Sequence, residues 1–388
     1  MSILEIKPDY YDDFHCVGGD CSFTCCQEWK IAVDKDTKKK WRSITAPKDL
    51  KKAGRLPDGL SEHSCLNQFI VKKDESDVIG LLPNMKCPFL DDDHLCRLVI
   101  DHGEQVLSDT CHTFPRDTHT YTDRVERTLV SCCPEIVDRW HERSELVFNN
   151  LTYMSKDSLR STTDKLKLVR DLIMYHLSYR ETANRTNLLK GFFILLDIYG
   201  KDEKGISFNI DDYIDDDAIR ELESTISSLD KDPEASLTER NELFLDMTEN
   251  YAAEGRYNSF LGPLRKTAED LDTTEYEDFI KVIASYESLF RNYLVAETFT
   301  SLLIPGMDLK DMVMQYQWMM MEYAIMMDAL YIKWQSSGDK TLSYETVREI
   351  IVLVSRLTGY DADDIEDYLC DCFESPVWDF SYADFLLG

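Results

Sequence analysis

The chain has 388 residues, of which 43% are hydrophobic and 11% aromatic, a composition that excludes a disordered protein and allows two or three domains. Its formal net charge is −30, and its densest basic stretch is the short run KDTKKKW at residues 35–41. Because so acidic a surface repels a phosphate backbone, we expect no nucleic-acid partner.

The first fifteen residues carry no sign of export. They have no basic region, no apolar stretch and no small-residue cleavage site, so we expect a cytoplasmic protein. In a reducing compartment, dense cysteines are more often metal ligands or catalytic groups than disulfides.

Ten of the twelve cysteines lie in the first 133 residues. A tight block in CVGGDCSFTCCQEW and a looser series after it contain these positions: Cys16, Cys21, Cys25 and Cys26, then Cys87, Cys96, Cys111, Cys132 and Cys133. Thiolates are the preferred ligands of zinc and of iron–sulfur iron. Metal binding is therefore the first hypothesis, and disulfides or unligated buried thiols are the alternatives.

The number and spacing of the cysteines do not distinguish zinc from an iron–sulfur cluster. One zinc ion takes four ligands, fewer than the thiols available, and the adjacent pair Cys25 and Cys26 is unusual for a simple zinc knuckle. An iron–sulfur cluster accepts cysteines that lie far apart in the sequence, and a second set of thiols could support a second metal. The spacing does not match that of radical enzymes, because Glu28 stands where a third cysteine would be needed.

Residues 1–140 have few long periodic stretches, and we expect an irregular cysteine-rich metal-binding domain there. The alternating pattern of residues 29–37 favours a short strand. Beside the cysteines, Trp29 could shield a cluster, Arg116 could pair with a carboxylate of a cofactor or of Glu126 or Glu135, and three histidines could replace a thiol as ligand. These histidines are His15, His94 and His112.

Helical periodicity dominates residues 141–388, which we expect to form an all-α domain, so that the fold class is mainly α. Helices are expected after the caps Ser155 or Ser158, up to a stop at Gly200, over 211–230, 236–255, 276–304, 312–334, 343–357 and 361–372. The Met-rich stretch 312–334 contains too many polar residues to cross a membrane and is expected to be a core helix. Cys370 and Cys372 could be late ligands.

Four motifs in the first third resemble the flagellin lysine-N-methylases, whose N-terminal part is related to CxxCxxCC-type zinc- or iron-chelating proteins. They are FHCVGGDCSFTCCQEWKIAVDKDT, KCPFLDDDHLCRLV, DTCHTFPR and VERTLVSCCPE, and the later segment FRNYLVAETFTSLLIPG is similar too. The resemblance implies methyl transfer from S-adenosylmethionine to lysines of flagellin or a similar surface protein.

The resemblance also implies an iron–sulfur cluster, most simply 4Fe–4S, with zinc as the alternative. The cysteines at the matching positions are Cys16, Cys21, Cys25, Cys26, Cys87, Cys96, Cys111 and Cys133, whereas Cys132 is extra. The sequence lacks the glycine-rich strand-to-helix turn of ordinary methyltransferases, so no residue is assigned to S-adenosylmethionine or to catalysis.

Two other functions are compatible with the same residues. One is a non-catalytic zinc- or iron-binding module with a helical interaction domain. The other is a redox sensor in which the vicinal pair at residues 25–26 or 132–133 reacts reversibly.

Overall fold

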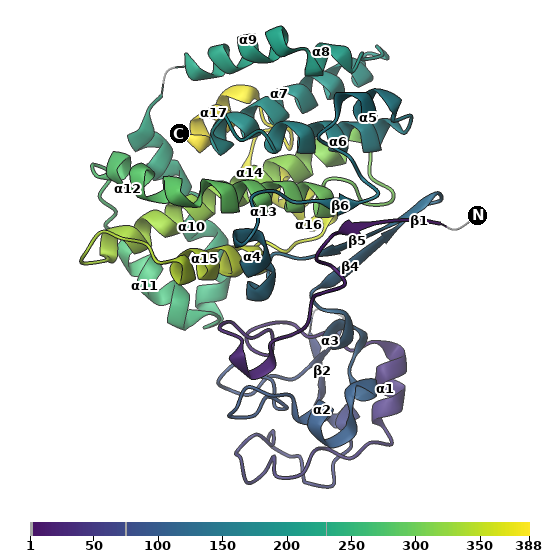
Figure 1. The fold of residues 1–388 in the computed structure, drawn as a ribbon. Helices are drawn as coiled ribbons and strands as arrows, with labels where there is room; N and C mark the ends of the chain where they lie inside the picture. Colours follow the sequence, from purple (N-terminus) through teal and green to yellow (C-terminus); the bar gives the residue numbers. More distant parts are fainter. Residues whose placement is uncertain (1–2, 74–75, 230) are drawn as a thin grey trace.

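The computed structural model describes residues 3–73, 76–229 and 231–388. It has a small lobe that carries most of the cysteines and a larger helical body, with a four-stranded sheet where the two meet (Figure 1). Most of the regular structure is helical, and the predicted mainly α class is confirmed.

The lobe is built from short elements around a small core of its own. The elements are η1 (Gly18–Asp20), α1 (Lys35–Trp41), η2 (Leu66–Phe69), β2 (Ile70–Lys73), β3 (Ser76–Ile79), α2 (Arg97–His102), η3 (Glu104–Val106) and α3 (Asp109–Thr113). Trp41 and Phe69 pack on the ring of Phe89, at centroid distances of 6.2 and 4.9 Å. The buried indole N–H of Trp41 donates to the carbonyl of Val106 at 2.7 Å, which fixes α1 against η3.

The prediction of a strand over residues 29–37 is mostly wrong. Ala32 forms one isolated bridge with Val78, and helix α1 begins at Lys35. The carboxylate of Asp34 accepts a hydrogen bond from the N–H of Thr37 at 2.8 Å and caps the helix. An N-cap of this kind outweighs an alternating pattern over so short a segment.

The sheet has the strand order β4-β5-β1-β6, and the lobe is inserted into it. Its strands are β1 (Leu4–Pro8), β4 (Arg116–Thr120), β5 (Arg124–Leu129) and β6 (Phe148–Asn149). β1 runs parallel to β5 with Leu4 opposite Arg124, while β4 and β6 pair antiparallel with β5 and β1. The chain therefore leaves the sheet after β1 and returns in β4, so that both ends of the lobe are anchored.

Buried charges join this sheet to the body. Glu126 of β5 accepts from the guanidinium of Arg124 at 2.6 Å and pairs with Arg170 of α6 (Lys165–Leu177). All three side chains are at most 2% exposed. The hydrophobic core of the body also contains residues from before, within and after the lobe, such as Phe14, Phe23 and Trp140. The domain boundary at residue 140 stays a prediction.

The body consists of helices packed around one long helix, α14. The helices are α4 (Pro134–His141), α5 (Lys156–Ser161), α6, α7 (Asn184–Glu203), α8 (Asp211–Ile214), α9 (Asp216–Ser227), α10 (Pro233–Ala253), α11 (Asn258–Ala268), α12 (Tyr276–Ile283), η4 (Ala284–Tyr286), α13 (Glu287–Ser301), α14 (Leu309–Ser336), α15 (Tyr344–Leu357), α16 (Ala362–Cys372) and α17 (Phe380–Leu387).

The helix expected at residues 312–334 is confirmed as α14, and three other expectations need correction. The single helix expected over 276–304 is broken at η4, and α7 continues through Gly200 to Glu203. The helix expected over 211–230 is divided into α8 and α9 at the extended Asp215, which caps α9, and residue 230 lies outside the described residues. Among the helices in the described part of the chain, none is long and apolar enough to cross a membrane.

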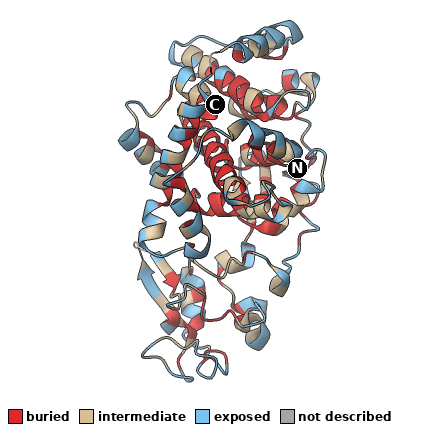
Figure 2. Cartoon of the chain, turned by 90° about the vertical axis from the view of Figure 1, so that its left-hand side faces the viewer, coloured by how far each residue is buried: buried red, intermediate tan, exposed pale blue. Residues whose placement is uncertain are grey.

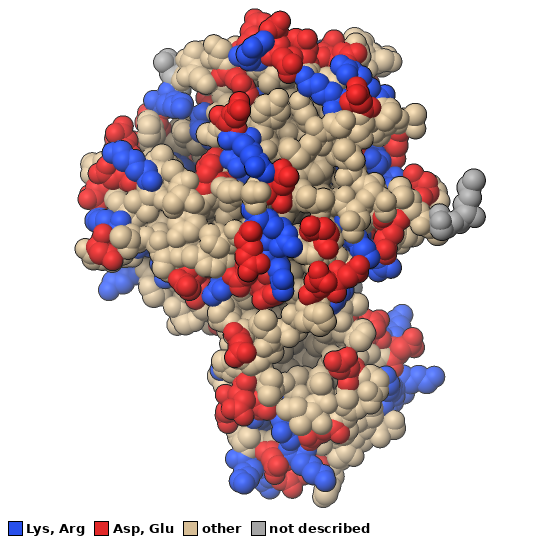
Figure 3. All heavy atoms as spheres, viewed as in Figure 1, with Lys and Arg blue, Asp and Glu red and all other residues tan. Residues whose placement is uncertain are grey.

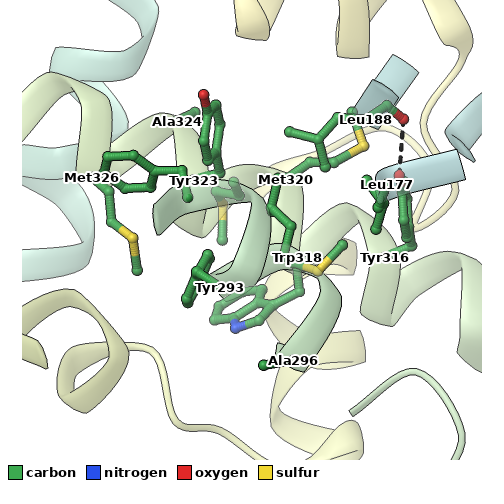
Figure 4. Packing of buried hydrophobic residues seen from close by; sticks show 14 of the residues in the cluster. Leu177, Leu188, Tyr293, Ala296, Tyr316, Trp318, Met320, Tyr323, Ala324 and Met326 are labelled. Carbon is green, nitrogen blue, oxygen red and sulfur yellow. Dashed lines mark hydrogen bonds between the residues drawn. The ribbon is translucent and has the colours of Figure 1, made fainter. Parts of the chain in front are cut away.

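Helix α14 is buried on nearly all sides, as Figure 2 shows for the centre of the body. The hydroxyl of its Tyr316 donates to the carbonyl of Leu188 in α7 at 2.9 Å (Figure 4). This contact requires Gly191 on α7, because a Cβ there would lie 2.2 Å from the Tyr316 hydroxyl oxygen. A glycine inside a helix normally costs stability, and here it permits close helix packing.

We expect Gly191→Ala to destabilise the protein by about 1–3 kcal/mol, because the added methyl group collides with Tyr316 in a packed core. The matched control is Gly200→Ala on the same helix, where a Cβ meets nothing within 4 Å. The control should be neutral or stabilise by up to about 1 kcal/mol. Urea unfolding followed by circular dichroism measures both, and equal effects would show that the close contact has no energetic consequence.

A candidate metal centre lined by cysteines

A cavity of about 770 Å³ lies in the cysteine-rich lobe. Six of the eight candidate ligands line it: Cys16, Cys25, Cys26, Cys87, Cys96 and Cys111. The rest of the wall is mainly apolar and aromatic, and includes Phe14, Trp29, Phe89 and Phe114. The fold thus brings thiols from residues 16 to 111 to one open cavity.

Short local structures hold these thiols in place. The backbone N–H of Cys87 donates to the carbonyl of Cys26 at 2.8 Å, which joins the cysteine block directly to the second series. Cys96 is the N-cap of α2. Cys111 lies within α3, where its N–H donates to the hydroxyl of Ser108 at 3.3 Å. These cysteines therefore lie in loops and short helices, and local hydrogen bonds rather than long elements fix their positions.

The two remaining candidate ligands lie beside the cavity. Cys133 is buried at the start of α4. Burial raises the pKa of its thiol, and the charges of Cys21 and Cys25 raise this pKa further. Burial, followed by the charges of Cys25 and Cys16, likewise raises the pKa of Cys21. Cys25 is thus close to both the cavity thiols and the pair at residues 132–133.

Most of these thiols are neutral at pH 7 in the absence of a metal. Burial raises the pKa of Cys111 to about 11 and that of Cys132 to about 12, and it raises the pKa of Cys87 as well. Cys25 is the exception. A hydrogen bond from Cys26, opposed by burial and aided by the charge of Arg356, lowers the pKa of Cys25 to about 7. A bound metal would deprotonate the others on binding, so that affinity would rise with pH.

The donor set suits a sulfur-ligated metal group. Within residues 3–73, 76–229 and 231–388, no three His, Cys, Asp or Glu side chains form a group arranged to hold a metal ion. The cavity nevertheless offers six thiols within one wall, and thiolate is the ligand that holds iron–sulfur clusters. The chemistry of the wall therefore fits the cluster that the resemblance implies.

Arg356 of α15 links the cysteine block to the body, a role that the sequence does not indicate. Its guanidinium donates to the carbonyls of Phe23, Thr24 and Cys132 at 2.9, 3.1 and 3.1 Å. It also lies over the rings of Phe23 and Trp29, 4.3 and 5.4 Å from their centroids. Only 6% of the residue is exposed, so this contact is part of the interior.

The other residues near the cysteines have mixed outcomes. Trp29, His15 and His112 line the cavity, whereas His94 does not. Arg116 pairs with neither Glu126 nor Glu135; it donates to the carbonyl of Phe14 at 3.1 Å and lies over that ring. Cys370 and Cys372 are exposed on α16, outside the cavity wall.

We expect Arg356→Met to loosen the contact between lobe and body, because three carbonyls, two of them in buried hydrogen bonds, lose their donor, at a cost of about 2–4 kcal/mol. Amide hydrogen exchange should become faster in residues 23–26 and 85–87. Arg348→Met is the matched control, because Arg348 lies on the same helix but pairs with Asp138 of α4. Unchanged protection of residues 23–26 in Arg356→Met would contradict this role.

Comparison with known proteins places the chain in a family. A family model of the FliB lysine N-methylase C-terminal domain matches residues 170–383, more than half of the chain. The flagellar biosynthetic protein FliU of Salmonella muenchen is 38% identical over 140 residues, which are 35% of this chain and 76% of that protein. Lysine-N-methylases of Salmonella choleraesuis and Salmonella typhimurium are each 36% identical over 140 residues.

These 140 residues are 35% of this chain and 32% of each lysine-N-methylase, so the match spans about a third of the length of those proteins. No solved structure matches. The family match runs from within α6 to within α17, which is most of the helical body. The chain therefore belongs to the FliB lysine N-methylase family, a family of protein-lysine N-methyltransferases.

Proposed function

We propose that this protein is an S-adenosylmethionine-dependent protein-lysine N-methyltransferase that acts on flagellin or a similar surface protein and carries an iron–sulfur cluster. The observation that carries the proposal is the cavity lined by six cysteines in a member of this family. The names of the relatives, a flagellar biosynthetic protein and lysine-N-methylases, support a flagellar substrate.

The cluster, most simply 4Fe–4S, would be held by thiolates of the cavity wall. Cys87, Cys96 and Cys111 are the best candidates, because they come from separate segments and the charges of Cys111 and Cys96 act on Cys87. Cys25 or Cys26 would complete the set. When bound, such a group supplies covalent cross-links between loops, and we propose this structural role here. Zinc in the same cavity is the alternative.

The surface suits a lysine-bearing substrate. The net charge of −30 gives an attractive potential for ammonium groups. On the face shown in Figure 3, acidic and basic side chains are interspersed over the helical body, and a column of basic side chains runs down its middle. The substrate lysine must lose its proton before methyl transfer, so a local base is required, and no residue is assigned to it.

We expect Cys87→Ser, Cys96→Ser and Cys111→Ser each to lower the iron and acid-labile sulfide content of anaerobically purified protein by at least about half, because serine is a poor ligand for this iron. The matched controls are Cys370→Ser and Cys372→Ser, whose thiols are exposed on α16. Iron and sulfide analysis with an absorbance spectrum measures all five. A colourless wild type that holds zinc would favour the chelating module.

We expect the cluster-loaded protein to transfer the labelled methyl group of methyl-labelled S-adenosylmethionine to lysines of purified flagellin. Mass spectrometry of the digested flagellin should identify N-methyl-lysine, and flagellin with blocked amines should take up no label. Failure of cluster-loaded protein to methylate flagellin would overturn the proposed activity. It would leave the non-catalytic metal-binding module with a helical interaction domain as the function.

A further inference from the structure

A second cavity, of about 640 Å³, lies in the helical body and shares no lining residue with the cysteine cavity. Six basic residues line it: Arg180, Arg185, Lys231, Arg240, Lys281 and Arg291. The acidic residues in its wall are Glu181, Glu277 and Glu287. Three of the basic residues already pair with acids outside the wall: Arg180 with Glu145, Arg185 with Asp384 and Lys281 with Asp278. Arg240 and Arg291 form no ion pair within the described residues, and they are the two guanidiniums left for a ligand. We call this cavity the arginine pocket.

Arg291 of α13 is the central observation. It is only 8% exposed, and its buried Nε has no hydrogen-bond partner in the described part of the chain. Burial lowers its pKa, and the charge of Arg180 lowers it further against the opposing effect of Glu287. The carboxylate of Glu287 instead accepts the backbone N–H of Asn184 at 2.5 Å. A buried donor without a partner is costly, and an anion in the pocket would remove that cost.

Arg240 of α10 supplies a second guanidinium with free donor capacity. It is 2% exposed, its Nη1 donates to the hydroxyl of Tyr276 at 2.7 Å, and its Nη2 has no partner among the described residues. Gly388 lies beside it, and no hydrogen bond or ion pair between the two is present in the described chain. The buried Oδ1 of Asn184 also lacks a partner. Unsatisfied polar atoms of this kind are rare in protein interiors.

The apolar part of the wall helps to define the class of ligand. Helix α7 starts at this pocket, but the N–H of its first residue, Asn184, already donates to the carboxylate of Glu287, so the arginines rather than this helix end supply the donors. Ile283, Tyr323 and Met327 line the same pocket and provide a buried apolar surface. The pocket therefore combines donors for an oxyanion with room for an apolar or aromatic group.

We propose that the arginine pocket binds a small molecule that bears a carboxylate or phosphate group, with Arg291 and Arg240 donating to the oxyanion and the apolar wall contacting the rest of the ligand. Planar guanidinium groups pair with both oxyanions through parallel hydrogen bonds. The carboxylate could belong to an amino-acid-like cofactor such as S-adenosylmethionine, and the phosphate to a nucleotide. This proposal stands independently of methyl transfer.

Isothermal titration of the full-length protein tests the pocket with three anionic probes: S-adenosylhomocysteine, adenosine monophosphate and inorganic phosphate. Adenosine, which has no oxyanion, is the neutral control. We expect at least one anion to bind with a Kd below about 1 mM, and adenosine to bind at least about tenfold more weakly. Binding of S-adenosylhomocysteine identifies a carboxylate ligand, and binding of adenosine monophosphate or phosphate identifies a phosphate ligand.

Arg291→Gln should weaken binding of that anion by at least about tenfold, and Arg291→Lys, which keeps the charge, should restore part of it. Arg220→Gln, at an exposed position on α9, is the matched control and should leave the affinity unchanged. Thermal unfolding of each variant shows that it is folded. The proposal is overturned if no anion binds the wild type, or if Arg291→Gln binds it as tightly as Arg220→Gln does. Because no flagellin is present, failure of methyl transfer does not affect this result.

Discussion

The contact of Arg356 with the cysteine block is the constraint on which the candidate metal centre depends. Its guanidinium holds carbonyls of the segment before Cys25 and the carbonyl of Cys132 at the same time. The first segment belongs to the lobe and the second to the start of the body. The spatial relation of the two groups of thiols therefore depends on how lobe and body dock, and a metal bound by both groups would stabilise the docked arrangement.

The sheet makes this docking possible. Because β1 and β4 both belong to it, the lobe is fixed at its two ends, and the pairing of β1 with β5 closes a long loop of chain. Closing such a loop costs entropy that grows slowly with its length. The core of the lobe is small, around Trp41 and Phe89, whereas the body has an extensive core around α14. Cross-links through thiolates would stabilise the part of the chain that has least hydrophobic burial.

The sequence predicts those features that local pattern determines. Clustered cysteines indicate the cavity, and the apolar residues around 312–334 indicate a core helix. The features that it does not predict depend on contacts between distant segments. Nothing near Arg356 marks it as a partner of Phe23, and the lack of a partner for the Nε of Arg291 within the described residues is visible only when the residues around it are known. The break at η4 and the start of α1 at Lys35 likewise depend on packing and capping, which a periodic pattern does not contain.

The two cavities show why net charge does not locate a site. At physiological ionic strength, exposed charges are screened beyond about 8 Å, so the acidic exterior acts on an approaching protein but contributes little inside a pocket. The arginine pocket contains the buried guanidiniums of Arg240 and Arg291 beside acidic residues such as Glu287, and the fields of buried charges are screened much less. A surface that attracts lysines and an interior that binds an anion are therefore compatible in one chain.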